Sequence, residues 1–440
     1  MRQAEPAARG VSSVRACPAA RRSPSPAAAA WRCLFWVLVF LVLLPGCVER
    51  DAEAHYRREV LAIVSQERFS LARWEVGALA QEALERSCAR GTPEAPAGED
   101  PVSTYLAVAA RLHAVRSQIE AAAAQHADDN AVRQLEEQEQ ALRSLATDLR
   151  PQAERVLEAQ FAQVLAEKRI GWFGLPLPPV IFRFTEPPNY LILSPRDEIR
   201  VRFSVYLEPG LTLARIQQLE KQLEQQLPNT SALISPTGGF SSWPTMIVDR
   251  ASLAWIVHTI GHEWVHLYLA PFPLGRAYDS SPDARAINET VADIAGIEIG
   301  DIVLQQFHNE FAIPTPGGAE RRNSHAVPGP SAAFDFDSEM RLTRQVVERM
   351  LAEGRIDEAE RYMEARRLEF LAHGYYIRRL NQAYFAFHGT YRTGPAAPPE
   401  DPIAPRLREL RARSTDVGDF LRRVRGITTV AELMELVPVR

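Results

Sequence analysis

Cysteine, lysine and long apolar runs are all scarce in this 440-residue sequence. Three of the four cysteines lie within the first 47 residues, so once that segment is set aside as a targeting signal, Cys88 is left with no partner for an intramolecular disulfide. Lysine occurs only at Lys168 and Lys221, which we attribute to base composition in the source genome. The longest apolar run, residues 34–44, has eleven residues, whereas a bilayer-spanning helix needs about twenty. A polytopic membrane protein is therefore excluded, and stability must come from burial of a core.

What is present is an ordinary globular composition with an uneven charge distribution. Hydrophobic residues make up 46% of the chain and charged residues 24%, which excludes a wholly disordered or collagen-like chain. The net charge is −5, yet residues 1–47 contain six arginines and a single acid. The remainder is thus more acidic than the whole and would repel a phosphate backbone, so we expect no nucleic-acid partner.

The N-terminal segment has the pattern of a targeting signal. Basic residues up to Arg32 precede the apolar run 34–44, which has the length of a signal-peptide core. The tetrapeptide that follows, Leu44-Pro45-Gly46-Cys47, resembles the lipobox of bacterial lipoproteins, although proline departs from the usual small or aliphatic residue. The resemblance implies cleavage before Cys47, a lipid on that cysteine, and a location in the bacterial cell envelope. An uncleaved anchor is the alternative; both place the remaining chain outside the cytoplasm.

The next 120 residues predict helices. Apolar residues recur at helical spacing in 52–90, and after a linker at 91–101 they recur again in 102–168. Four apolar positions seven residues apart predict a seam against a partner helix, in an antiparallel pair. We interpret 48–168 as a helical stalk or scaffold, in which Pro151 starts a new helix or kinks one. The seam residues are Leu135, Leu142, Leu149 and Val156.

Beyond residue 168 the pattern changes to strands and then to helices. Runs rich in β-branched and aromatic residues predict four strands, three before a helix at 212–227 and one after it. We expect a small, mainly antiparallel sheet in a subdomain spanning 169–250, and a helical region spanning 251–440 with Pro- and Gly-rich loops at 312–332 and 392–405. The predicted fold class is α+β and predominantly α. The predicted strands are 179–184, 190–194, 199–207 and 245–248.

Two histidines mark a candidate metal site. His262 and His266 lie four residues apart in a segment that Asp249 or Ser252 can cap and Pro271 ends. On a helix, positions i and i+4 lie one above the other, so both imidazoles can reach one zinc ion at about 2.0–2.1 Å. Glu263 follows the first histidine and is placed to act as a general base on a water molecule.

A second helix supplies acids at the same spacing. Ser281 and Pro282 are typical of a helix start, and Glu289 and Asp293 then fall on one helical face. Three protein ligands and one open position characterise catalytic zinc, and Glu289 would be the third ligand. Asp293 could accept the remaining N–H of a ligand histidine. We therefore predict one zinc ion.

Residues 262–266 (HEWVH) and 288–293 (NETVAD) resemble the gluzincin clan of zinc metallopeptidases. The resemblance covers residues 245–300, and elsewhere there is faint similarity to uncharacterised bacterial lipoproteins. It implies a zincin-like catalytic domain that hydrolyses peptide bonds in a peptide or protein substrate. The implied roles are zinc ligands for His262, His266 and Glu289, general base for Glu263, and support of a histidine ligand for Asp293.

Other residues are weaker candidates for the site. Tyr384, His388 and Tyr391 share a helical face, and in that clan a C-terminal tyrosine or histidine stabilises the oxyanion, so Tyr384 and His388 are candidates, with core packing as the alternative. Strand 245–248 could pair by its edge with an extended substrate. Asn288 could bond to substrate backbone, and His258 would support the site or pack in the core. His308 and His325 are expected at the surface, the latter in a loop that could act as a lid.

Two other functions are compatible with the same residues. The protein could be a lipoprotein whose helical half binds a partner and whose zinc is structural. It could also hydrolyse a non-peptide amide, such as a cell-wall component.

Overall fold

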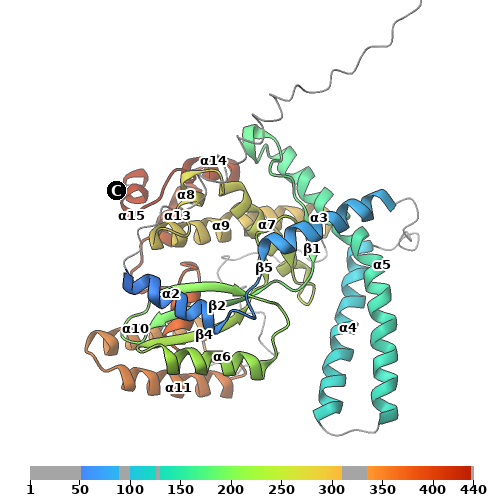
Figure 1. The fold of residues 1–440 in the computed structure, drawn as a ribbon. Coiled ribbons are helices and arrows are strands. Elements are labelled where there is room, and N and C mark those ends of the chain that lie inside the picture. Colours follow the sequence, from blue (N-terminus) through green and yellow to red (C-terminus); the bar gives the residue numbers. More distant parts are fainter. Residues whose placement is uncertain (1–50, 89–99, 125–128, 310–333, 438–440) are drawn as a thin grey trace, which may run out of the picture. The chain divides into compact units, whose positions relative to one another are not determined.

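The computed structural model describes residues 51–88, 100–124, 129–309 and 334–437 (Figure 1). The predictions for residues 1–47, including Cys47, for the loop at 312–332 and for His325 lie outside these ranges. The chain divides into two compact units, Met1–Tyr56 and Arg57–Arg440, and the description below concerns the second. None of the helices in the described ranges is long and apolar enough to cross a bilayer.

The N-terminal part of the chain is helical, as predicted, but in more pieces. The expected helix 52–90 is interrupted, because Arg68 forms a bridge with Leu207 and the segment joins a sheet. The second helical stretch forms the predicted antiparallel pair (Figure 1). The Arg116 guanidinium of one helix bonds to Glu139 of the other at 2.8 Å. The second helix of this pair continues through Pro151, so the prediction of a new helix there is wrong. The helices are α2 (Asp51–Ile63), α3 (Leu71–Cys88), α4 (Pro101–Ala124) and α5 (Asp129–Glu167).

The strands form two three-stranded sheets, in the orders β3-β2-β4 and β1-β6-β5, instead of the single sheet predicted. Three of the four pairings between these strands are antiparallel, and only β1 with β6 is parallel, so the mainly antiparallel character is confirmed. The prediction had omitted β4. The strands are β1 (Phe182–Phe184), β2 (Asn189–Pro195), β3 (Phe203–Leu207), β4 (Thr230–Pro236), β5 (Gly239–Phe240) and β6 (Thr245–Ile247).

Carboxylates from helices cover the outer edges of both sheets. On helix α6 (Leu213–Gln226), Glu220 and Glu224 accept hydrogen bonds from alternate backbone N–H groups of β4 at 2.7 and 3.0 Å. Glu154 and Glu158 of α5 do the same for β1, at 2.7 and 3.0 Å. Strand β6 is flanked by β1 and β5, so the prediction that 245–248 offers a free edge is wrong.

Two long helices cross at close range in the middle of the unit. They are α7 (Leu253–Leu269) and α9 (Pro282–Phe307), and each begins at the serine cap that the sequence predicted, Ser252 and Ser281. Glycines face each other at the crossing: a Cβ on Gly296 would lie 2.5 Å from the backbone N of His262. Because no side chain separates the helices there, residues of α9 can reach those of α7.

The core around these helices is continuous. Buried side chains of α4, α5, α7 and α9 pack with those of three C-terminal helices into one cluster. A second cluster lies between α10 and α11, and α12 packs on β2 and β4. The remaining helices are α8 (Pro273–Arg276), α10 (Phe336–Ala352), α11 (Ile356–Ala372), α12 (Gln382–His388), α13 (Ile403–Ala412), α14 (Val417–Val424) and α15 (Val430–Leu436).

Candidate metal centre

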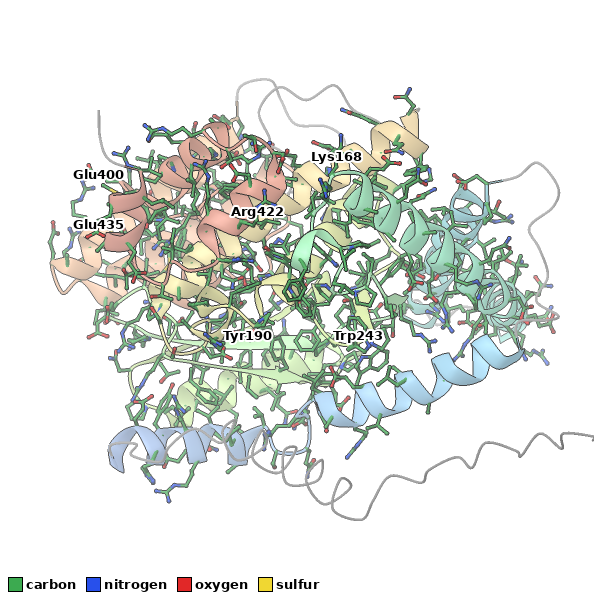
Figure 2. The ribbon with its side chains drawn as sticks, turned by 90° about the horizontal axis from the view of Figure 1, so that it is seen from above. Lys168, Tyr190, Trp243, Glu400, Arg422 and Glu435 are labelled. Atoms are coloured by element: carbon green, nitrogen blue, oxygen red, sulfur yellow. The ribbon has the colours of Figure 1, made fainter. Side chains whose placement is uncertain are left out.

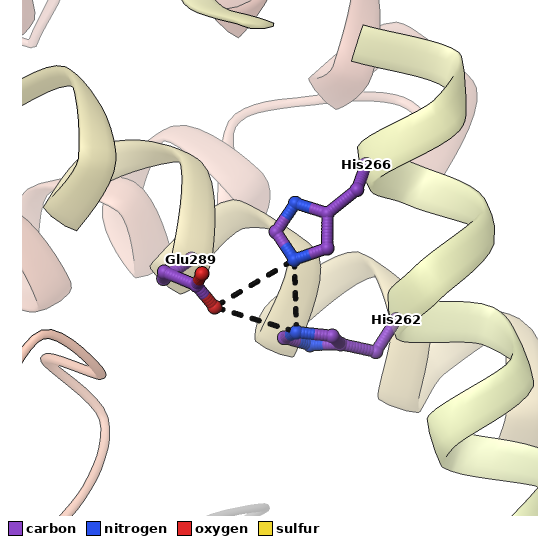
Figure 3. Close-up of side chains that lie close together, drawn as sticks. All are labelled: His262, His266 and Glu289. Carbon is purple, nitrogen blue, oxygen red and sulfur yellow. Dashed lines mark hydrogen bonds and ion pairs between the residues drawn. The ribbon is translucent and has the colours of Figure 1, made fainter. Parts of the chain in front are cut away.

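Three predicted ligands meet where α7 and α9 cross (Figure 3). The Nε2 atoms of His262 and His266 lie 3.0 Å apart. The Oε2 atom of Glu289 lies 3.4 Å from the first nitrogen and 3.6 Å from the second. The three side chains are nearly buried, with 10%, 15% and 6% of their surfaces exposed. The structure thus brings together the three residues that the sequence assigned to one metal.

The two imidazoles are oriented by contacts to their Nδ1 atoms, which point away from the metal group. His262 Nδ1 faces Asp293 Oδ1 at 3.0 Å, and His266 Nδ1 faces Asn288 Oδ1 at 2.7 Å. An ionised carboxylate and an amide oxygen only accept hydrogen bonds, so each Nδ1 carries a hydrogen. In a neutral imidazole the Nε2 atom then presents a lone pair, and both lone pairs point toward the space beside Glu289.

The two oxygens of Glu289 have different surroundings. Oε1 accepts a hydrogen bond from the Tyr278 hydroxyl. Oε2 is buried and has no hydrogen-bond donor among the described residues. Burial by itself raises the pKa of Glu289, but the neighbouring imidazoles of His266 and His262 lower the pKa well below its ordinary value. Glu289 is therefore a carboxylate with one oxygen left for another ligand.

Three side-chain atoms that can each donate an electron pair to a metal lie close together, an arrangement that a cation would stabilise. Ligands in a tetrahedron around zinc, at about 2.0–2.1 Å from the metal, lie about 3.3 Å from one another. The three separations here, 3.0, 3.4 and 3.6 Å, bracket that value. The group could therefore hold a metal ion without rearrangement of the backbone.

Comparisons with known proteins add no assignment. No family model, curated protein or solved structure matches this chain. What the site can do therefore has to be argued from its own side chains.

Glu263 lies next to this group and is held on its other side by the β5–β6 segment. Its Oε2 atom accepts a hydrogen bond from the Ser241 hydroxyl, and Ser241 Oγ also lies 3.3 Å from the backbone oxygen of Glu263. Its Oε1 atom faces Gly239, where an added Cβ would lie only 2.6 Å away. Glycine at position 239 therefore keeps the space beside this oxygen open.

Partly exposed aromatic side chains surround the metal group. The Tyr278 ring centroid lies 5.9 Å from that of His266, and the Tyr391 centroid lies 6.2 Å from that of His262. Burial, and after it the charge on Glu289, raises the pKa of Tyr278 well above its ordinary value. The hydroxyl of Tyr278 is thus protonated at neutral pH and donates to Glu289.

Two more tyrosines near the metal group come from the sheet. Tyr190 of β2, labelled in Figure 2, and Tyr206 of β3 stack with ring centroids 4.6 Å apart. Burial raises the pKa of Tyr206 well above its ordinary value, and the charges of Glu289 and Glu263 raise it further. Tyr206 therefore lies within electrostatic reach of both the metal group and the predicted base.

The aromatic stripe predicted in 384–391 is arranged differently from our expectation. Tyr384 packs against Ile192 and Leu233, and its ring is tilted against that of His388 with the centroids 4.2 Å apart. Burial raises the pKa of Tyr384. It is Tyr391, the third member of the stripe, whose ring lies beside His262.

Two lesser predictions, those for Asn288 and His308, are changed by the structure. Asn288, expected to bind substrate backbone, instead holds His266. His308, expected at the surface, is 5% exposed and bonds to Gln160 at 2.9 Å. His258 pairs with Asp301 at 2.8 Å one turn before the metal group. Sequence reasoning missed Tyr278 altogether, because a tyrosine in a loop has no distinguishing pattern.

Proposed function

We propose that the protein is a zinc-dependent hydrolase of peptide bonds, tethered to the membrane through a lipid on Cys47 and facing outside the cytoplasm. The observation that carries this proposal is the convergence of two imidazole nitrogens and one carboxylate oxygen, all within 3.6 Å of one another. A neighbouring side chain contacts the other polar atom of each ligand: Asp293 for His262, Asn288 for His266 and Tyr278 for Glu289. The three ligands are therefore preorganised for a cation.

Zinc is the metal that best suits the donor set. Imidazole nitrogens and a single carboxylate oxygen are borderline ligands that zinc accepts in a tetrahedral site. Three protein ligands, all that the described residues offer to this group, leave a fourth position for water. A closed structural site would have filled that position with a further side chain.

The neighbouring side chains suit hydrolysis. Bound zinc would supply Lewis acidity toward a carbonyl oxygen and lower the pKa of a water molecule to about 7. Glu263 would accept the proton of that water at Oε1 and return it to the leaving amine, while Ser241 holds Oε2. Asp293 and Asn288 would keep the two histidines in the tautomer that ligates through Nε2.

The developing negative charge on the substrate oxygen needs a hydrogen-bond donor. Tyr384 and His388 were the predicted candidates. We propose Tyr391 in their place, because its ring lies beside His262, whereas Tyr384 lies among apolar side chains of the sheet. The resemblance to gluzincins supports a tyrosine from this part of the chain in that role.

The proposal is tested by zinc analysis combined with digestion of a peptide library. Wild-type protein should bind one zinc per chain and cleave peptides. Glu263→Gln should keep its zinc and lose about 10²–10⁴-fold in turnover, the usual contribution of a general base. Glu298→Gln, a matched change on α9 in an acid that bonds to Arg411 and not to the metal group, should keep full activity.

Each other outcome has a distinct meaning. Equal cleavage by wild type and Glu263→Gln would remove Glu263 from the mechanism. One zinc per chain without cleavage of any peptide would favour the structural-zinc scaffold. Cleavage of a non-peptide amide alone would keep the hydrolytic site and change its substrate.

A further inference from the structure

Arg285 lies one helical turn before Glu289, on the same face of α9, and its role is not explained by the metal group. Its guanidinium carbon lies 5.0 Å from the ring centroid of Tyr278. The hydroxyl of that same tyrosine bonds to Glu289. A permanent positive charge therefore lies next to the candidate metal centre.

The partners of Arg285 leave part of its hydrogen-bonding capacity unused. Nε donates to the backbone oxygen of Tyr278 at 3.3 Å, and Nη2 donates to Asp279 at 3.0 Å. Nη1 has no acceptor among the described residues. Arg285 is 17% exposed but Asp279 is 90% exposed, and an ion pair with so exposed an acid contributes little. Nη1 therefore remains available for a further acceptor.

Tyrosines and acids lie close to the guanidinium. The pKa of Arg285 is lowered by burial but raised overall by Tyr190, Tyr278, Asp279 and Glu289, which are all close to it. Tyr190 comes from β2, so Arg285 lies between the sheet and the helix that carries Glu289. A substrate that reaches the metal group on this side would contact the guanidinium.

We infer that Arg285 binds a carboxylate of the substrate, beside the bond that the metal centre cleaves. A planar guanidinium with a free nitrogen recognises carboxylates better than any other side chain does. The inference rests on the proposed function, and it narrows the substrate class to peptides with a negative charge next to the scissile bond. That charge is either the C-terminal carboxylate or an acidic side chain, and the experiment below separates the two.

The test compares matched peptides with and without the carboxylate. One pair differs only by a free acid or an amide at the C-terminus; a second pair, amidated in both members, differs by Glu or Gln next to the cleaved bond. Loss of a charge-assisted contact should raise KM by about 10- to 100-fold for the charged member in Arg285→Gln, and little for the neutral member. Arg285→Lys should restore part of the preference.

Two further variants keep the test decisive if Arg285→Gln folds poorly. Asp279→Asn removes an exposed competitor for the guanidinium and should lower KM for the charged peptides. Arg276→Gln changes an exposed arginine on α8 and should leave both peptide pairs unaffected.

A binding measurement separates this inference from the proposed function. Zinc-loaded Glu263→Gln is titrated in a calorimeter with N-acetyl-dialanine and with its amide. Binding of the acid that is about tenfold or more tighter than binding of the amide supports the carboxylate site, provided that the double variant Glu263→Gln/Arg285→Gln shows no such difference. Equal binding of acid and amide overturns it, even if peptides are cleaved. Absence of all cleavage overturns the peptidase proposal and leaves this binding test standing.

Discussion

Replacing Asp293 tests how much the metal group depends on the residues behind it. Asp293 is 1% exposed, and it holds His262 through Oδ1 at 3.0 Å and accepts from the Thr393 hydroxyl through Oδ2 at 2.6 Å. Asp293→Asn keeps the shape and one acceptor oxygen but loses the charge. The Thr393 hydroxyl can rotate to accept from the new amide, which lets the amide oxygen stay toward His262.

The expected loss can be worked from these contacts. Mutation of such supporting residues typically costs about 10- to 100-fold in metal affinity, or about 1.4–2.7 kcal/mol. Asp293→Asn preserves the tautomer of His262, so its zinc affinity should fall by about tenfold. Asp293→Ala removes the ion pair with His262 and the hydrogen bond from Thr393, so its zinc affinity should fall by about a hundredfold.

The assay is competition for zinc with a chromophoric chelator at pH 7, with thermal unfolding as a check on folding. Asp301→Asn is the matched control, because Asp301 lies on the same helix and pairs with His258 at 2.8 Å but not with a metal ligand. It should bind zinc like the wild type. If Asp293→Asn also binds zinc like the wild type, then Asp293 does not orient His262 and the reasoning fails.

Two other predictions concern the framework of the site. Gly296→Ala would place a Cβ 2.5 Å from the backbone of His262, so it should lower the free energy of unfolding by about 1–3 kcal/mol and weaken zinc binding. The control Gly77→Ala, whose Cβ meets nothing within 4 Å, should raise the free energy of unfolding by about 0.5–1 kcal/mol. Equal melting temperatures for the two variants would contradict this prediction. Burial raises the pKa of Glu154 from 4.5 to about 8. The folded state therefore holds this proton more tightly, and stability is lost as the pH rises between these values, by at most about 5 kcal/mol. Glu154→Gln should flatten this decline in urea titrations from pH 4.5 to 8, and an unchanged slope would contradict the assignment.

The helices that carry the site were predictable because their signals are local. Ser252 and Ser281 cap α7 and α9 as expected, and the spacing of His262 and His266 defines one face of a helix. The pairing of Glu289 with those histidines came from the three ligands that catalytic zinc needs and from the resemblance to gluzincins. A spacing of four residues fixes direction on a helix whatever the rest of the fold does.

The sheets were less predictable, because their edges depend on residues far away in the chain. Strand β4 has few β-branched residues, and it is held by Glu220 and Glu224 and by pairing with β2. Strand β6 was expected to be an edge, but β5 covers it through a pairing of only two residues. Nothing in the local sequence of either strand indicates these partners.

The side chains around the metal group were the least predictable part of the site. Tyr278 and Thr393 reach the site from loops, and Tyr206 reaches it from a strand distant in sequence. Tyr391 lies beside His262 whereas Tyr384 packs in the core, although both share a helical spacing. Helix α12 ends at His388, so Tyr391 lies beyond the helix, and helical periodicity does not describe its position.

The central claim is that His262, His266 and Glu289 hold one zinc ion. Anomalous diffraction at the zinc absorption edge, from crystals of the zinc-loaded protein, tests it most directly. We expect a single strong peak at about 2.0–2.2 Å from both Nε2 atoms and from Glu289 Oε2. A zinc-saturated crystal with no peak at this point, or with the Glu289 carboxylate turned away from the peak, would contradict the account.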